Sequence, residues 1–277
     1  MKHRILLLVI FFSFLSVTIP VNVSAQSVYD QTFEEYKLSL EEYSQLHDDY
    51  VLARSQYLRF DTLTSRNNAK EATRSMLAAR DEVLIRYFES IIARTNEIDG
   101  LDQSTKDRLS SQLSDEVQWF GDHKASLVGA GSIEDLVADS NEARQRYNTL
   151  GPIIYEPLSQ IPYGRVKRFQ DRLNENFLAL KEKVNIIRAE ERPEYQFTTR
   201  KLEVIDRWIF ETEDRLERSN EKLLGVVDQI DRVPQSGSLS NSRSRNNQIV
   251  ESLKVVLQDQ KDASLRMREI IREVKTK

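Results

Sequence analysis

The stretch "YDQTFEEYKLSLEEYSQLHDDYVLARSQY", residues 29 to 57, places a tyrosine at every seventh position. These are half of the tyrosines in the chain: Tyr29, Tyr36, Tyr43, Tyr50 and Tyr57. Mostly apolar side chains lie three or four residues from them, namely Phe33, Leu40, Leu46, Ala53 and Phe60. Two such positions in every seven residues form one stripe along a helix, as in a coiled coil. The stretch therefore predicts an amphipathic helix of ~42 Å from the first tyrosine to the last.

Similar periodicity recurs along the rest of the chain. Apolar stripes predict helices over residues 69–98, 104–127, 166–187, 202–230 and 249–274, and a further helix that begins at Ser132. Repeats of seven in at least three separate helices favour closely aligned packing along long seams. We therefore expect an all-α fold, an elongated bundle of about six to seven long, near-antiparallel amphipathic helices with coiled-coil-like seams, and no β-sheet.

Two segments interrupt this pattern. "GPIIYEPLSQIPYG", residues 151–164, contains Pro152, Pro157 and Pro162, and a proline inside a helix costs ~3 kcal/mol. We therefore expect the chain to be kinked or broken there. "VPQSGSLSNS", residues 233–242, has the composition of a loop, and the helical pattern also loosens at Arg192-Pro193.

The first 25 residues have the three regions of a secretory signal peptide. Basic residues precede an apolar run from Ile5 to Ile19, and Val23-Ser24-Ala25 supplies small residues for cleavage. An uncleaved anchor is the alternative, although the run is shorter than the ~20 residues needed to span a bilayer. The predicted organisation is a signal peptide over 1–25, N-terminal helices over 26–131 and central and C-terminal helices over 132–277. The last two segments can also form one continuous bundle.

The amino-acid composition limits which compartments and which partners are possible. The chain has no cysteine, so an exported product has no disulfide framework and is stabilised by packing alone. Its net charge of −4 becomes −6 once the two basic residues of the signal are removed. Seven acids against Lys37 alone make residues 26–50 strongly acidic, which argues against nucleic acid or anionic lipid as the main partner. After signal cleavage no segment is apolar enough to span a membrane.

The tyrosine line is the candidate contact stripe, and two interpretations of it stay open. The five rings either fill the space between long helices, or remain partly exposed for a glycan, a peptide or a partner helix. Acid pairs precede three of the tyrosines, at 34–35, 41–42 and 48–49. Stacked carboxylates attract basic partners or loosely bound calcium, but no calcium-binding loop is present, so we predict no metal site.

The sequence offers little for catalysis. Outside the signal only His47 and His123 remain, and no nucleophile, phosphate-loop or zinc motif is present. A two-carboxylate glycosidase is the one enzyme class that the many acids leave open, because its two carboxylates need not be close in sequence. We therefore expect no catalytic residues, no cofactor and no enzymatic activity.

The tyrosine line followed by "YLRFDTLTSRNNAKEATRSMLAARDEVLIRYFESI", residues 57–91, resembles uncharacterised exported all-helical proteins of candidate-phylum bacteria. In those proteins a similar line precedes an Ala-rich helix with an R-D-x-x-L core. The resemblance covers residues 26–98 and becomes general beyond them. It implies a bacterial origin and an extracytoplasmic location, and it implies no activity.

These observations predict an exported, non-enzymatic helical scaffold, spacer or interaction protein of the cell envelope or surface. Its partner would be another protein or a second copy, contacted through helical faces. The alternative is a sensor-like module whose tyrosine-lined groove holds a glycan, a peptide or a small aromatic ligand.

Overall fold

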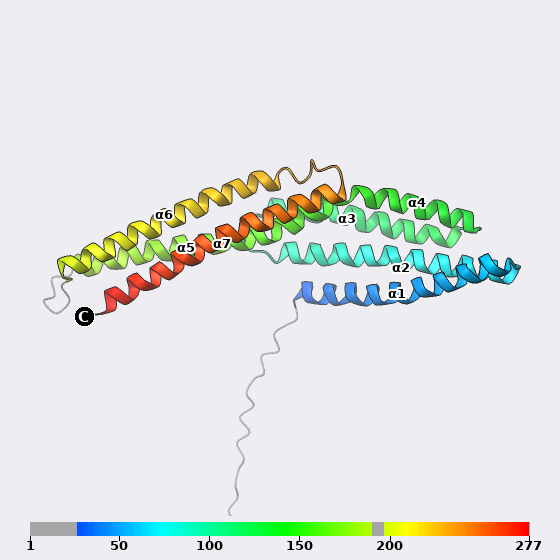
Figure 1. The fold of residues 1–277 in the computed structure, drawn as a ribbon, viewed down its shortest axis with the longest axis horizontal. Helices are drawn as coiled ribbons and strands as arrows, with labels where there is room; N and C mark the ends of the chain where they lie inside the picture. The colour runs from blue at the N-terminus through cyan, green and yellow to red at the C-terminus, as the bar shows by residue number, and fades with distance from the viewer. Residues whose placement is uncertain (1–26, 190–196, 277) are drawn as a thin grey trace, which may run out of the picture.

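The computed structural model describes residues 27–189 and 197–276, and within them the fold is entirely helical. Seven α-helices run along the longest axis of an elongated molecule (Figure 1). Their bounds are α1 Val28–Phe60, α2 Leu63–Asn96, α3 Gln103–Ser126, α4 Ile133–Thr149, α5 Gly151–Ala189, α6 Thr199–Ile230 and α7 Leu239–Lys275, with a short 3-10 helix at Leu127–Gly129. The predicted all-α bundle is confirmed. The predicted signal peptide and the segment at Arg192-Pro193 lie outside the described residues.

The helices form two groups that share α5. The N-terminal bundle, α1 to α4, has α2 at its centre, and α1 packs extensively against α2 alone. The C-terminal bundle, α5 to α7, is a three-helix arrangement in which α7 packs against both α5 and α6. Both groups are visible in Figure 1. None of the helices in the described part of the chain has the length and apolar character needed to cross a membrane.

The seven-residue repeats of α6 and α7 build the C-terminal bundle. Leu223 and Ile230 from α6 are buried together with Leu253 and Val256 from α7, and Leu216 from α6 is buried with Ala263 and Met267 from α7. One polar layer interrupts this seam. Ser219 donates to Gln170 Oε1 at 2.7 Å, and Gln260 Nε2 donates to the same oxygen at 3.0 Å. Buried polar layers of this kind fix the register of packed helices.

The proline-rich segment, where a kink or a break was predicted, contains no break in the helix. α5 continues from Gly151 through Pro157 and Pro162, and the chain breaks just before it, at Leu150 between α4 and α5. Pro152 lies in the first turn, where its missing N–H needs no partner. The two interior prolines each remove one helical hydrogen bond, but burial of Ile154, Pro157 and Val166 stabilises the helix through them.

The predicted loop at 233–242 is shorter than expected. α6 ends at Ile230 and α7 begins at Leu239, so residues 239–242 are helical. Ser238 caps α7 by accepting from Asn241 N, and Gly237 takes the left-handed conformation with φ of +67°. The serines that suggested a loop are therefore partly helix caps.

Candidate functional site

All five tyrosines of the candidate stripe are half-buried, so the line is partly exposed and is not a fully buried core stripe. Tyr36 packs against Tyr87 of α2, with ring centroids 5.3 Å apart. Tyr43 and Tyr50 pack against a buried cluster that contains Met76 and Leu77. Arg94 of α2 lies over the ring of Tyr29, 4.7 Å from its centroid. Whether the exposed edges contact a partner stays a prediction.

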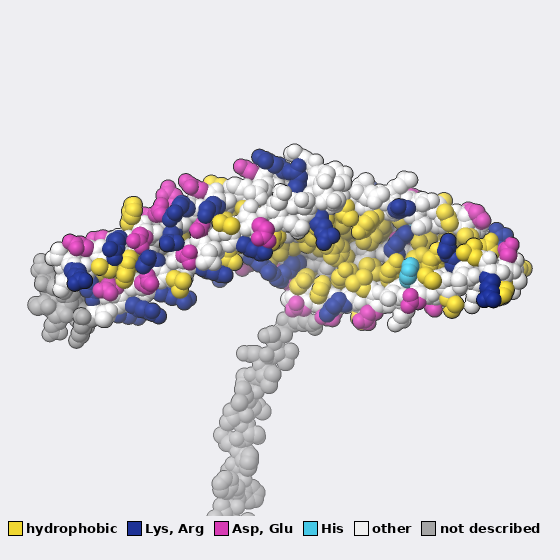
Figure 2. Space-filling model, viewed as in Figure 1, with side chains coloured by type: hydrophobic (Ala, Val, Ile, Leu, Met, Phe, Trp, Pro, Cys, Tyr) yellow, Lys and Arg dark blue, Asp and Glu magenta, His cyan; other side chains and the backbone are white. Residues whose placement is uncertain are grey.

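Tyr43 belongs to a pocket that lies between α1 and α4. Its volume is about 340 Å³, and side chains from four helices line it: Leu40 and Tyr43 from α1, Arg80, Val83 and Leu84 from α2, Phe120 from α3, and Ser140, Ala143, Arg144 and Tyr147 from α4. Figure 2 shows hydrophobic side chains gathered in a hollow over this part of the molecule. Phe120 and Ala143, at its base, also belong to the buried core, so the pocket reaches into the bundle.

Two arginines are the only charged residues that line this pocket in the described structure. Arg80 forms two long contacts. Its Nη2 lies 3.4 Å from Asp81 Oδ1, and its Nη1 lies 3.3 Å from Ser140 Oγ. Among the described residues, Arg144 pairs with no carboxylate. The acids of α1 do not line the pocket, although they make the segment around Tyr43 strongly acidic. The pocket is therefore apolar with local positive charge.

Four phenol rings from different helices lie near one another beside the pocket. Burial, with the nearby hydroxyls of Tyr36, Tyr147 and Tyr155, raises the pKa of Tyr87 to about 12. The hydroxyl of Tyr87 therefore stays neutral at physiological pH and can donate a hydrogen bond. Tyrosine and arginine are the residue types most enriched where proteins bind partners.

Beneath the pocket lies a buried polar network that sequence inspection did not predict. His123 Nδ1 is 2.5 Å from Asp81 Oδ2, and His123 Nε2 is 3.0 Å from the backbone carbonyl oxygen of Asp139. Both ring nitrogens are thus engaged, and neither is free to act as a general base. The ring of Trp119 stacks on His123 at 5.2 Å. The geometry identifies His123 as a structural residue.

The same network extends to a second ion pair, in which only the carboxylate is buried. Arg146 donates to both oxygens of Glu116, at 2.8 and 2.6 Å, and Glu116 is buried. The guanidinium of Arg146 also lies over the Trp119 ring, 5.5 Å from its centroid. This bidentate geometry ties α4 to α3. In residues 27–189 and 197–276, no cluster of three or more His, Asp or Glu side chains could hold a metal ion.

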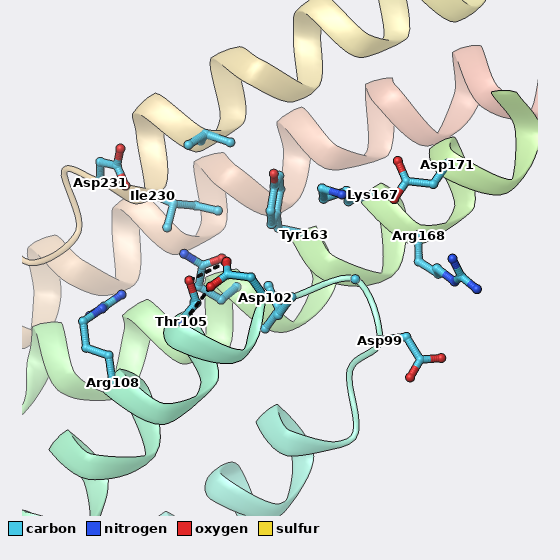
Figure 3. A pocket seen from close by; sticks show the side chains of 14 residues that line it. Asp99, Asp102, Thr105, Arg108, Tyr163, Lys167, Arg168, Asp171, Ile230 and Asp231 are labelled. Atoms are coloured by element: carbon cyan, nitrogen blue, oxygen red, sulfur yellow. Dashed lines mark hydrogen bonds and ion pairs between the residues drawn. The ribbon is translucent and has the colours of Figure 1, made fainter. Parts of the chain in front are cut away.

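A larger pocket of about 440 Å³ forms where the α2–α3 turn meets α5 and the end of α6 (Figure 3). Most of its ionic groups already have protein partners. Arg108 binds Glu156 at 2.6 Å and Lys167 binds Asp171 at 3.0 Å. Asp102 caps α3 through Ser104 and Thr105, and these hydrogen bonds hold the pKa of its carboxyl well below its usual range. The charged residues that line this pocket therefore have mainly a structural role, and the pocket at Tyr43 is the better candidate site.

The fold and site define an all-α helical bundle with an apolar pocket beside a line of tyrosines. Comparison of the chain with protein-family models, with curated proteins and with solved structures finds no match. The geometry of the chain is therefore the basis for its proposed function. Tyr43 was the one pocket residue among the predicted site residues. The spacing of Val137, Arg144 and Tyr147 along α4 could have indicated a second exposed face.

Proposed function

We propose that the chain is an exported, non-enzymatic helical scaffold, spacer or interaction protein of the cell envelope or surface, which acts through helix-mediated contacts. The elongated arrangement of its helices supports a role in spanning distance (Figure 1). Export is supported by the signal-like pattern of residues 1–25. Both ring nitrogens of His123 are engaged by protein groups, which supports a non-enzymatic function.

The observation that carries this proposal is the surface of α1. This helix packs extensively against α2 alone, yet large apolar side chains remain exposed around it. Leu38 is 64% exposed, Leu52 58% and Leu58 67%. Single exposed leucines are common on proteins, but several on one acidic edge helix are suited to contact with another helix.

The first prediction tests contact through α1 in living cells. A photo-crosslinking amino acid at position 52 should yield discrete protein adducts in the envelope of a producing cell, because this side chain would lie in the interface. The matched control is position 224 on α6, where Leu224 is similarly exposed at 61%. Equal labelling from both positions, or no adduct from position 52, would contradict the proposal.

The same proposal predicts shape and association in solution. The chain from Gln26 onward should scatter X-rays as an elongated particle. Leu52→Glu with Leu58→Glu should weaken any self-association at least ~10-fold, because two carboxylates would have to be desolvated. Leu224→Glu should leave it unchanged. A scattering profile of a compact sphere would contradict a spacer role.

A second candidate function is favoured by the pocket between α1 and α4. We propose as the alternative that the chain is a ligand-binding module, with Tyr43 as one wall of the site. A volume of about 340 Å³ lies at the lower end of the range for small-molecule sites.

A further inference from the structure

We propose that the pocket between α1 and α4 binds an amphiphilic carboxylate, that is, a small molecule with an apolar chain or ring and one carboxylate head. This inference rests on the second candidate function and deepens it by naming the class of ligand. It is independent of helix-mediated contact through α1.

The shape and lining of the pocket specify the apolar part of the ligand. Leu40, Val83 and Leu84 form apolar walls, and Phe120 lies at the base. The side chain of Phe120 is itself fully buried, so the base of the pocket is backed by the hydrophobic core. Burying each methylene of such a ligand is favourable, because apolar surface is removed from water. A purely polar ligand, such as a glycan, would find few partners on these walls.

The two arginines specify the head group. Arg80 lies on α2 and Arg144 on α4, and both line the pocket. The neighbour of Arg80, Asp81, is engaged more closely by His123, at 2.5 Å compared with 3.4 Å for Arg80. Arg80 forms only long contacts, at 3.4 Å with Asp81 and 3.3 Å with Ser140, and these use two of its five N–H donors. A planar guanidinium matches the geometry of a carboxylate, and hydrogen bonds between them are charge-assisted.

Charge complementarity explains why this head should be anionic in a protein whose net charge is negative. The net charge of −4 belongs to the whole chain, and seven acids are concentrated in residues 26–50. None of those carboxylates lines the pocket, where both charged side chains are positive. Because the two arginines line the pocket itself, they can pair directly with the head group, whereas Glu41 and Glu42 are exposed and act on it through water, whose high dielectric constant weakens their effect.

Isothermal titration calorimetry with decanoate and 1-decanol tests the proposal directly. The two probes share an apolar chain and differ in the head group. We expect the wild-type chain from Gln26 onward to bind decanoate at least ~10-fold more tightly than 1-decanol, because a charge-assisted pair forms only with the carboxylate. Arg144→Gln should remove most of this preference. Arg172→Gln, an exposed arginine on α5 outside the pocket, should preserve it.

The choice of Arg144 over Arg80 and one further variant keep the test independent of folding. Arg144 is exposed, so its replacement should leave the thermal unfolding temperature unchanged, whereas Arg80 adjoins the buried Asp81. Ser140→Phe places a ring in the pocket and should abolish binding of both probes. Equal affinity for decanoate and 1-decanol would overturn the carboxylate assignment but leave a ligand site in place. No binding of either probe would overturn both the assignment and the second candidate function.

Discussion

Replacing Gly100 by alanine should lower the free energy of unfolding by about 3 kcal/mol, at the upper end of the range for overpacking. A Cβ atom built at Gly100 would lie 1.8 Å from the carbonyl oxygen of Gly164 and 2.6 Å from its carbonyl carbon. These are backbone atoms of α5, so no side-chain rotation relieves the clash. The α2–α3 turn would have to lift away, which exposes Ile98 and Leu101, both now buried.

The matched control is Gly225→Ala. Gly225 lies inside α6, and a Cβ atom there would meet nothing within 4 Å. Since alanine is a better helix former than glycine by ~1 kcal/mol, this substitution should raise the free energy of unfolding by a similar amount. Urea unfolding followed by circular dichroism compares the two variants. If Gly100→Ala behaved like Gly225→Ala, the close approach of the α2–α3 turn to α5 would be wrong.

Helical periodicity predicted most of the fold because local pattern and tertiary burial agree over long segments. In α6 and α7 the residues at seven-residue intervals are those that the seam buries, such as Leu216 and Leu253. The helix continues through the proline-rich start of α5, where a kink or a break was predicted, and the absence of a break there has a physical reason. A missing hydrogen bond is a local cost, whereas the burial of Ile154 and Pro157 against other helices is a tertiary gain that the segment does not encode alone.

The candidate site was harder to predict than the helices. Its lining comes from residues far apart in sequence, such as Tyr43 and Tyr147, and periodicity does not specify which helices become neighbours. The tyrosine line showed which face of α1 carries large rings. It could not show that α1 would pack extensively against α2 alone. Because only one helix covers them, the rings remain half-buried.

Removing the buried histidine should also have a large effect. We expect His123→Ala to lower the free energy of unfolding by about 3 kcal/mol at neutral pH, because Asp81 would be left buried without its closest partner. The control is His47→Ala, which removes an exposed ring beside Tyr43 and Tyr50 and should change the free energy of unfolding by less than ~0.5 kcal/mol. Comparable losses for the two variants would contradict the structural role of His123.

The pH dependence of stability gives a sharper test of the same pair. A carbonyl oxygen can only accept, so His123 Nε2 carries a proton, and one more proton lies between Nδ1 and Asp81 Oδ2. Burial raises the pKa of the Asp81 carboxyl. The folded chain therefore holds a proton that the unfolded carboxyl releases above pH ~3.9. The extra proton therefore stabilises the folded chain fully below pH ~3.9, and this stabilisation is lost as the pH rises through the folded pKa of Asp81.

Asp81→Asn should remove this dependence while keeping the contact. An asparagine amide can donate to Nδ1 of a neutral imidazole whose Nε2 proton still binds the Asp139 carbonyl oxygen. We therefore expect Asp81→Asn to be much milder than His123→Ala. Measured by urea unfolding at several pH values, the stability of the wild type relative to Asp81→Asn should decline as the pH rises. A difference that grew with pH would mean that Asp81 is held as a carboxylate below its ordinary pKa, and that its charge, not a shared proton, joins α2 to α3.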